Sequence, residues 1–264
     1  QGVSSAASDV YKRQEMAGEY ASRGSLDLPG RQEELLKAVA ALGKPVVLVL
    51  IAGRPLSINW ASENIPAILE AWEPGSEGGN AVADILFGDV NPGGKLPVSF
   101  PRSGGHSPLY YARTLTHQPE THPQYRSRYW DGLASPLYPF GYGLSFTTFE
   151  YSNLKLSSTK AKIGATIKVR VDVKNTGKVA GDEVAQLYIH QRWGTDSRPV
   201  RELKGFERIH LNPGESRTLE FKLGPDELSY WSSNVEKQIQ DKAVFDVWAG
   251  TDSTATLHSE FEIA

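Results

Sequence analysis

Cysteine is absent from the 264 residues of this chain, which excludes disulfide bonds, thiolate metal sites and cysteine nucleophiles. Long apolar runs are missing as well, because the longest, residues 46–52, is far shorter than the roughly 20 residues of a membrane helix. A large excess of either sign of charge is also lacking, since the net charge is −3 and both signs are spread along the chain. Without a basic stripe, the chain is a poor candidate for a nucleic-acid-binding protein.

The first fourteen residues, QGVSSAASDVYKRQ, show no hydrophobic periodicity and contain no apolar core of a signal peptide. We therefore interpret residues 1–14 as a junction or cloning scar and leave them out of the fold prediction.

Residues 15–147 have the pattern of an α/β domain. Apolar residues recur at helical spacing between Pro29 and Gly43, two residues that favour the beginning and the end of a helix. Two apolar runs, 46–51 and 67–72, predict strands that are buried in a parallel sheet, and a further helix follows them. This order of elements predicts a layered α/β sandwich whose first strands are missing.

Residues 148–264 follow a different pattern, with a period of two. Between Ile167 and Val173 apolar residues alternate with charged ones, as in a strand with one buried face. About seven such short strands, separated by turns such as NPG at 212–214, predict an immunoglobulin-like or fibronectin type III-like β-sandwich.

Complete catalytic motifs are hard to find in this sequence. The six histidines never form H-E-x-x-H, and neither a G-x-S-x-G elbow nor a phosphate-binding Walker loop is present. His117 and His122 share a loop with Glu120, which is a weak hint of a metal site, but a solvated loop is the better interpretation. Carboxylates remain, and glycoside cleavage needs two of them, one as acid and one as nucleophile or base.

Several segments, taken in their order along the chain, resemble glycoside hydrolase family 3 enzymes of the β-glucosidase type. In the α/β half they are GEYASR (18–23), LDLPGRQ (26–32), GKPVV (43–47), GRPL (53–56), EAWEPG (70–75), ILFGDVNPGGKLP (85–97) and PLYPFGYGLS (136–145). In the second half, NTG (175–177), GDEV (181–184) and ELKGF (202–206) resemble the fibronectin type III-like module that ends many of these enzymes.

This resemblance implies a retaining, exo-acting β-glycosidase built from a TIM-type barrel, an α/β domain and a β-sandwich. The barrel of the family supplies an aspartate nucleophile, and in many members the α/β domain supplies a glutamate as acid/base. That role carries over to Glu19. An acid about 5 Å from an ionised carboxylate has a raised pKa and can hold a proton near neutral pH. No metal and no organic cofactor is implied, because a pair of carboxyl groups suffices for this chemistry.

Three further residues are candidates for substrate binding. Arg54 follows a predicted strand, where ligand loops lie in open α/β sheets, although an ion pair that supports the loop is the better interpretation for it. Tyr129 and Trp130 lie in an irregular segment and are candidates for the rim of a sugar site. Trp72 ends a predicted buried strand, so packing is the better interpretation for it.

The partner that the resemblance implies is the missing N-terminal barrel, which takes about 250 residues in such folds. Without it we expect the isolated chain to be inactive, and we expect a truncated sheet to expose an apolar face and an unpaired edge. The family also suggests a periplasmic or secreted enzyme that acts on oligosaccharides or other β-glycosides. Two alternatives stay open: a non-catalytic module that binds carbohydrate or protein, and a β-xylosidase-type enzyme of the same family.

Overall fold

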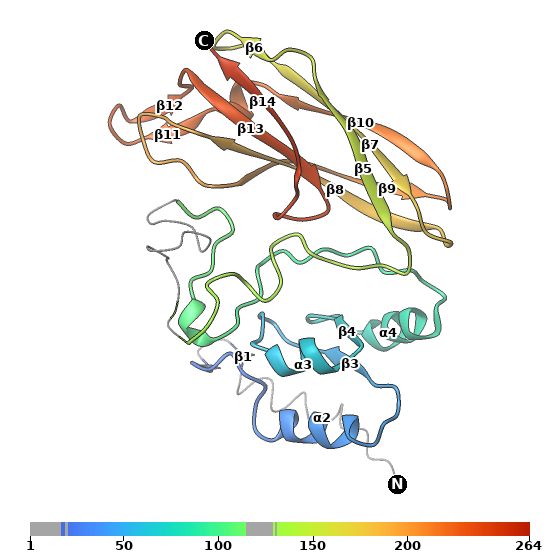
Figure 1. The fold of residues 1–264 in the computed structure, drawn as a ribbon. Helices are drawn as coiled ribbons and strands as arrows, with labels where there is room; N and C mark the ends of the chain where they lie inside the picture. Colours follow the sequence, from blue (N-terminus) through green and yellow to red (C-terminus); the bar gives the residue numbers. More distant parts are fainter. Residues whose placement is uncertain (1–16, 19–20, 115–128, 130) are drawn as a thin grey trace. The chain divides into compact units, whose positions relative to one another are not determined.

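The computed structural model describes residues 17–18, 21–114, 129 and 131–264, and these form two compact units (Figure 1). The first unit contains the chain up to Asp89 together with Phe100–Leu109 and Ser135–Tyr138, and the second contains the remainder. Within the described residues, no helix is long and apolar enough to cross a membrane.

The first unit is an α/β unit. Its elements are β1 (Ala17–Gly18), β2 (Ala21–Ser22), α2 (Gln32–Ala40), β3 (Val47–Leu50), α3 (Asn59–Asn64), β4 (Ala67–Glu70), α4 (Gly78–Phe87) and the 3-10 helix η1 (Gly104–His106). Strands β3 and β4 are parallel, with Val47 opposite Ala67 and Leu50 opposite Glu70. Helix α3 is part of the connection between them, as parallel pairing requires.

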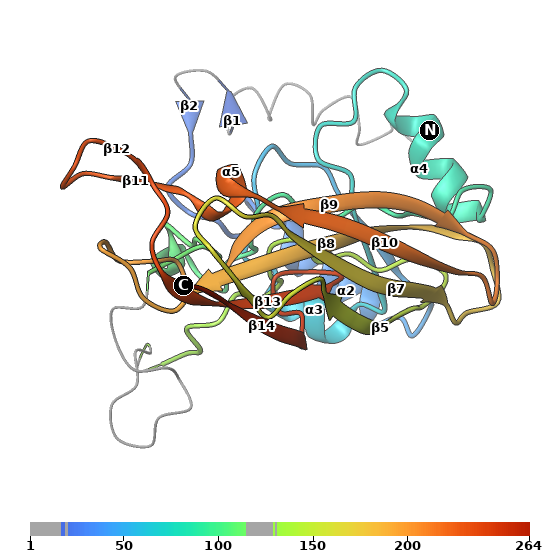
Figure 2. The same ribbon diagram turned by 90° about the horizontal axis from the view of Figure 1, so that it is seen from above.

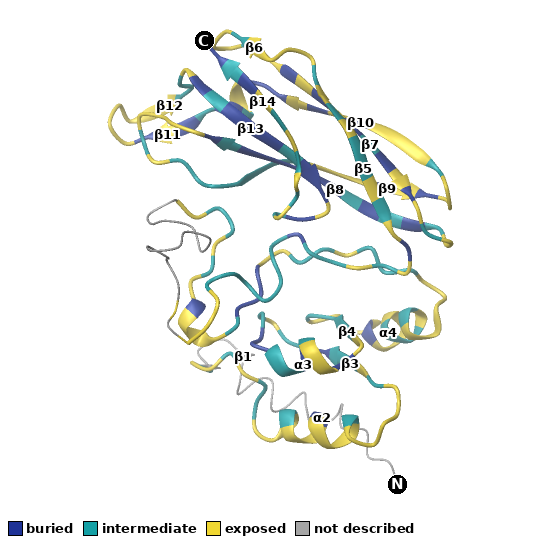
Figure 3. Cartoon of the chain, in the orientation of Figure 1, coloured by how far each residue is buried: buried dark blue, intermediate teal, exposed yellow. Residues whose placement is uncertain are grey.

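The predicted apolar face is present in this unit. Strand β3 pairs only with β4 among the described residues, so its other edge carries no strand there. Apolar residues of this unit are exposed as well: Leu35 on α2 is 65% exposed and Val47 on β3 is 48% exposed. Figure 3 shows that most of α2 is exposed, with few buried positions. Leu36, Leu50 and Ile58 are buried and belong to the small core of the unit.

The second unit is a β-sandwich (Figures 1 and 2). Its elements are β5 (Phe149–Leu156), β6 (Lys160–Ala161), β7 (Ile167–Asn175), β8 (Gly181–Gln191), β9 (Glu202–Leu211), β10 (Ser216–Leu223), α5 (Pro225–Leu228), β11 (Tyr230–Ser232), β12 (Lys237–Ile239), β13 (Ala243–Gly250) and β14 (Leu257–Ile263). One sheet has the strand order β10-β7-β5, and the other has the order β6-β14-β13-β8-β9.

The two sheets enclose one apolar core, as the alternating pattern predicts. The apolar residues of β7 from Ile167 to Val173 are all buried, and the charged residues between them point outwards. Facing positions come from β8 and β13, where Leu187 and Val247 are fully buried. The predicted β-sandwich is therefore confirmed. The domain boundary at residue 148 stays a prediction, although β5 begins directly after it, at Phe149.

Two loop segments, 90–99 and 139–147, belong to the second unit and pack against the sandwich. The Asn91 side chain donates to the Ala180 carbonyl oxygen at 2.9 Å and accepts from the Phe146 N–H at 2.7 Å. At Gly93 an added Cβ would lie 2.9 Å from the Asp182 Cβ, so only glycine fits this close approach. These contacts make the VNPGGKLP segment (90–97) part of the sandwich surface.

Candidate functional site

In the sequence, the expected acid/base residue falls between the first two strands. Strands β1 and β2 are antiparallel, with Ala17 opposite Ser22 and Gly18 opposite Ala21. Glu19 and Tyr20, which connect these strands, lie outside the described residues. The assignment of Glu19 therefore stays a prediction.

The chain that follows β2 forms a closed turn. The Arg23 Nη1 donates to the Asp27 carbonyl oxygen at 3.1 Å, and the Ser25 hydroxyl donates to the Asp27 carboxylate at 2.8 Å. The Asp27 N–H donates back to the Ser25 hydroxyl at 3.1 Å. Serine and aspartate side chains typically hold such turns by bonding the backbone nearby.

This turn is also tied to the loop that follows β3. The Arg54 Nη1 donates to the Arg23 carbonyl oxygen at 2.6 Å, and the Ser57 N–H donates to the Leu26 carbonyl oxygen at 2.8 Å. Arg54 thus supports a loop, as the sequence suggested, and among the described residues it does so through a hydrogen bond to the Arg23 backbone carbonyl. Contact between Arg54 and substrate stays a prediction.

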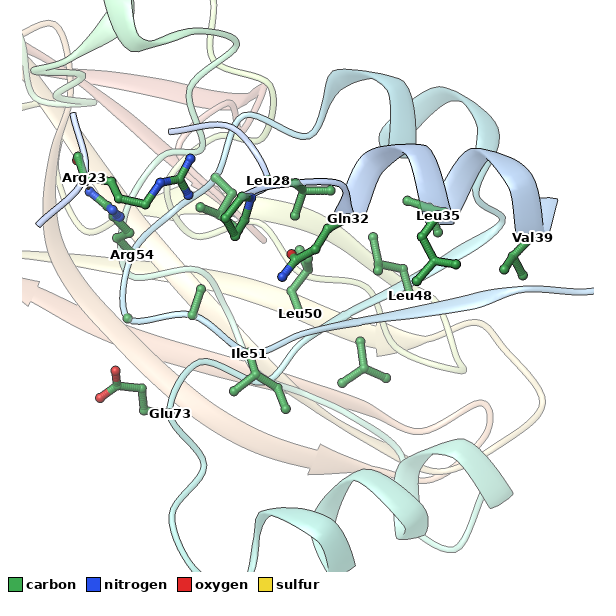
Figure 4. A pocket seen from close by; sticks show the side chains of 16 residues that line it. Arg23, Leu28, Gln32, Leu35, Val39, Leu48, Leu50, Ile51, Arg54 and Glu73 are labelled. Carbon is green, nitrogen blue, oxygen red and sulfur yellow. Dashed lines mark hydrogen bonds between the residues drawn. The ribbon is translucent and has the colours of Figure 1, made fainter. Parts of the chain in front are cut away.

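A pocket of about 420 Å³ lies between α2, β3 and the loop after β3 (Figure 4). In Figure 4, Arg23 and Arg54 lie together at one end, and Leu35, Leu48 and Val39 extend towards the other. Most of the lining is aliphatic, and Glu73 is its only carboxylate among the described residues. A sugar-binding pocket needs several convergent polar groups. We therefore interpret the aliphatic part as an uncovered packing surface and the arginine end as the chemically relevant part.

Glu70, at the carboxyl end of β4, is a titratable residue that the sequence analysis did not single out. Burial raises the pKa of its carboxyl group from 4.5 to about 7, and a hydrogen bond from the Trp72 N–H opposes this shift. That N–H lies 3.0 Å from Oε1, whereas Oε2 is buried without a hydrogen-bond partner among the described residues. The backbone of Trp72 has a φ of 51°, which is rare for a bulky residue. In the sequence, Glu70 stood out only as a member of the apolar run 67–72 and as the first residue of the EAWEPG segment.

The other aromatic candidates are not brought together by the described structure. Tyr129 is exposed, and Trp130 lies outside the described residues, so neither prediction of a substrate contact is tested. The same holds for the weak metal hint at His117, Glu120 and His122. The prediction that Trp72 packs is confirmed, because its ring meets that of Phe100 edge to face, with centroids 5.9 Å apart.

Comparison with known proteins decides the family. The profile of the Glycosyl hydrolase family 3 C-terminal domain matches residues 5–146, and that of the Fibronectin type III-like domain matches residues 183–253. The chain belongs to glycosyl hydrolase family 3. Both halves of the predicted architecture, the α/β domain and the fibronectin type III-like sandwich, are thereby confirmed.

Individual members of family 3 are similar over most of this chain. A periplasmic β-glucosidase of Salmonella typhimurium is 45% identical over 96% of the chain, and a β-xylosidase of Formosa agariphila is 47% identical over 90%. The crystal structure of a β-glucosidase from Listeria innocua in complex with glucose superimposes with a TM-score of 0.88 at 39% identity, over 94% of this chain and 35% of its own. The chain spans about a third of the length of these relatives, 34% and 32% of the two enzymes.

Proposed function

We propose that this chain forms the acid/base side of a retaining, exo-acting β-glycosidase that removes terminal β-linked sugars from oligosaccharides or other glycosides. The observation that carries this proposal is the family 3 match over residues 5–146, which includes the Gly18–Glu19 motif. In the reaction, Glu19 gives its proton to the leaving glycosidic oxygen and afterwards takes a proton from the attacking water.

The position of the neighbouring chain supports this role. The turn after β2 is bonded to residues 54 and 57, which follow the carboxyl end of β3. In open α/β sheets, ligands bind outside the carboxyl ends of the strands. Glu19 comes four positions before Arg23 in the sequence. It is therefore only a few residues away from a turn that is bonded to the loop after the carboxyl end of β3.

The nucleophile belongs to the barrel in this proposal, so the isolated chain turns over no glycoside. The Salmonella relative is named periplasmic, and this supports a periplasmic or secreted location for the enzyme. Tyr129 and Trp130 are proposed as part of the substrate rim. A β-xylosidase activity is the second candidate, because the Formosa relative of that name is 47% identical.

A chimera tests the proposal. Residues 15–264 replace the matching third of the Salmonella β-glucosidase, and the chimera and the isolated chain are assayed with an aryl β-glucoside and an aryl β-xyloside. We expect turnover by the chimera and none by the isolated chain, and the ratio of the two rates identifies the preferred sugar. A folded chimera that hydrolyses neither substrate would contradict the proposal and favour a non-catalytic binding module.

A further inference from the structure

Among the described residues, the turn after β2 is joined to the loop after β3 by a side-chain and a backbone hydrogen bond. Arg54 Nη1 lies 2.6 Å from the Arg23 carbonyl oxygen, and the Ser57 N–H lies 2.8 Å from the Leu26 carbonyl oxygen. The Arg54 bond is charge-assisted, which makes it the stronger type. Its acceptor, the Arg23 carbonyl, is one residue after the end of β2, whereas the acceptor of the Ser57 bond, on Leu26, is four residues after it.

The loop that carries Arg54 is itself firmly packed. Leu56, Ser57 and Ile58 are all buried directly after it. On the other side, a Cβ added at Gly53 would lie 2.8 Å from the Glu73 carboxylate oxygen, so this position is closely packed as well. Pro55 fixes its own backbone φ. The backbone from which the Arg54 side chain extends is therefore held in place by packing on both sides.

The held carbonyl is coupled to the first strand pair through a short piece of chain. Arg23 follows Ser22 directly, and Ser22 is paired with Ala17 across β1 and β2. Because Arg23 directly follows the last residue of β2, a displacement of its carbonyl also displaces the end of that strand. Figure 4 shows Arg23 and Arg54 next to each other at the same end of the pocket.

We propose that Arg54 is a positioning residue, which holds the Arg23 carbonyl and with it the end of β2 at the carboxyl end of β3. Its importance for catalysis rests on the proposed function, in which the residue between β1 and β2 that transfers the proton is Glu19. Misplacement of a catalytic group by about 1 Å can cost on the order of 100-fold in rate. In this account Arg54 acts on the proton-transfer step through the Arg23 backbone, as the alternative to the substrate contact that the sequence suggested for it.

The hydrogen bond from Arg54 to the Arg23 carbonyl is tested first, on the 264-residue chain and without any assay of activity. Trypsin cleaves after arginine, and it needs the Arg23–Gly24 peptide bond to leave its hydrogen bond. Under native conditions we expect cleavage there to be about 10-fold faster in Arg54→Met than in the unmodified chain, because cleavage follows the population of the opened form. Arg54→Lys, which keeps the charge and a donor, falls between them. Cleavage after Arg31, whose side chain is 88% exposed, serves as the internal reference. Equal rates at Arg23 in all three proteins would overturn the proposal.

The catalytic consequence is tested in the chimera with two aryl β-glucosides, one with a poor and one with a good leaving group. A misplaced acid slows only the substrate that needs protonation. We expect Arg54→Met to lower kcat about 10- to 100-fold for the poor leaving group and less than about 3-fold for the good one. Arg54→Lys should recover part of this loss, and Arg31→Met is the matched control.

Other results would overturn the inference and leave the proposed function in place. A raised KM with unchanged kcat for both substrates would make Arg54 a substrate contact. An equal loss of kcat for both substrates, together with a lowered Tm, would reduce it to a structural residue. An inactive unmodified chimera would instead contradict the proposed function, while the trypsin result would still decide whether Arg54 holds the chain.

Discussion

The ammonium group of Lys95 lies 3.1 Å from the carboxylate of Glu183, and their side chains are only 10% and 3% exposed, respectively. The Tyr151 hydroxyl donates to the other carboxylate oxygen at 2.7 Å. Lys95 also donates to the Thr251 hydroxyl and to the Gly143 carbonyl oxygen. A buried ion pair thus joins the GGKLP segment to strands β5 and β8 of the sandwich.

We predict that Glu183→Ala lowers the free energy of unfolding of the sandwich by about 3–5 kcal/mol, because it leaves the Lys95 charge buried and unpaired. The double variant Lys95→Met/Glu183→Leu should recover most of this loss, since it removes both charges and keeps the volume. Tyr151→Phe is the control and should cost about 1–3 kcal/mol. Urea denaturation measures all three, and a cost below about 1 kcal/mol for Glu183→Ala would contradict the buried pair.

The Glu70 carboxyl group predicts a pH dependence of the first unit. Its pKa is raised to about 7 in the folded state from 4.5, so the folded state holds a proton that the unfolded state has lost between these pH values. Stability therefore falls as the pH rises from about 4.5 to 7 and is constant above. After allowance for partial exposure, the total change is about 2 kcal/mol.

Glu70→Gln removes this dependence, because the neutral amide has no proton to lose. We expect the variant to match the unmodified chain at low pH and to be more stable by about 2 kcal/mol above pH 7. Calorimetry across this range measures the effect, with the exposed Glu63→Gln as control. The assignment fails if both variants keep the slope of the unmodified chain.

The exposed apolar surface of α2 and β3 predicts self-association of the isolated chain. Leu35 and Val47 are exposed, and one edge of β3 carries no strand among the described residues. Such edges and patches promote aggregation. Leu35→Glu should reduce light scattering at high concentration without lowering the Tm, whereas Leu36→Glu, at a buried position, should unfold the unit. Unchanged scattering in Leu35→Glu would show that this surface does not drive association.

The sequence predicted the sandwich well because β7 alternates strictly between buried and exposed positions. It missed β5, whose pairing with β7 shifts register between Ser152 and Lys155, with Asn153 at a φ of 53°. A bulge of this kind interrupts the period of two on which strand prediction depends. Helix α3 was missed because its six residues, NWASEN, are too few to show helical periodicity.

The candidate site was less predictable. Glu19 was found through resemblance alone, because a single glutamate before a short strand carries no signal of its own. The place of Arg54 after a strand was visible in the sequence, but its hydrogen bond to the backbone carbonyl of Arg23, 31 positions away, was not. Every residue has a backbone carbonyl, so the sequence does not show which residue accepts such a hydrogen bond. The raised pKa of Glu70 was not visible either, because it comes from burial by the folded chain.

The most direct test of the central claim is the effect of Glu19→Gln in the chimera on the same two aryl β-glucosides. Glu34→Gln is the matched control, since Glu34 forms an exposed ion pair with Arg31. We predict that Glu19→Gln lowers kcat/KM about 100-fold or more for the poor leaving group and far less for the good one, whereas Glu34→Gln changes neither. Activity of Glu19→Gln within about twofold of the unmodified chimera on both substrates would contradict the assignment of the acid/base to this chain.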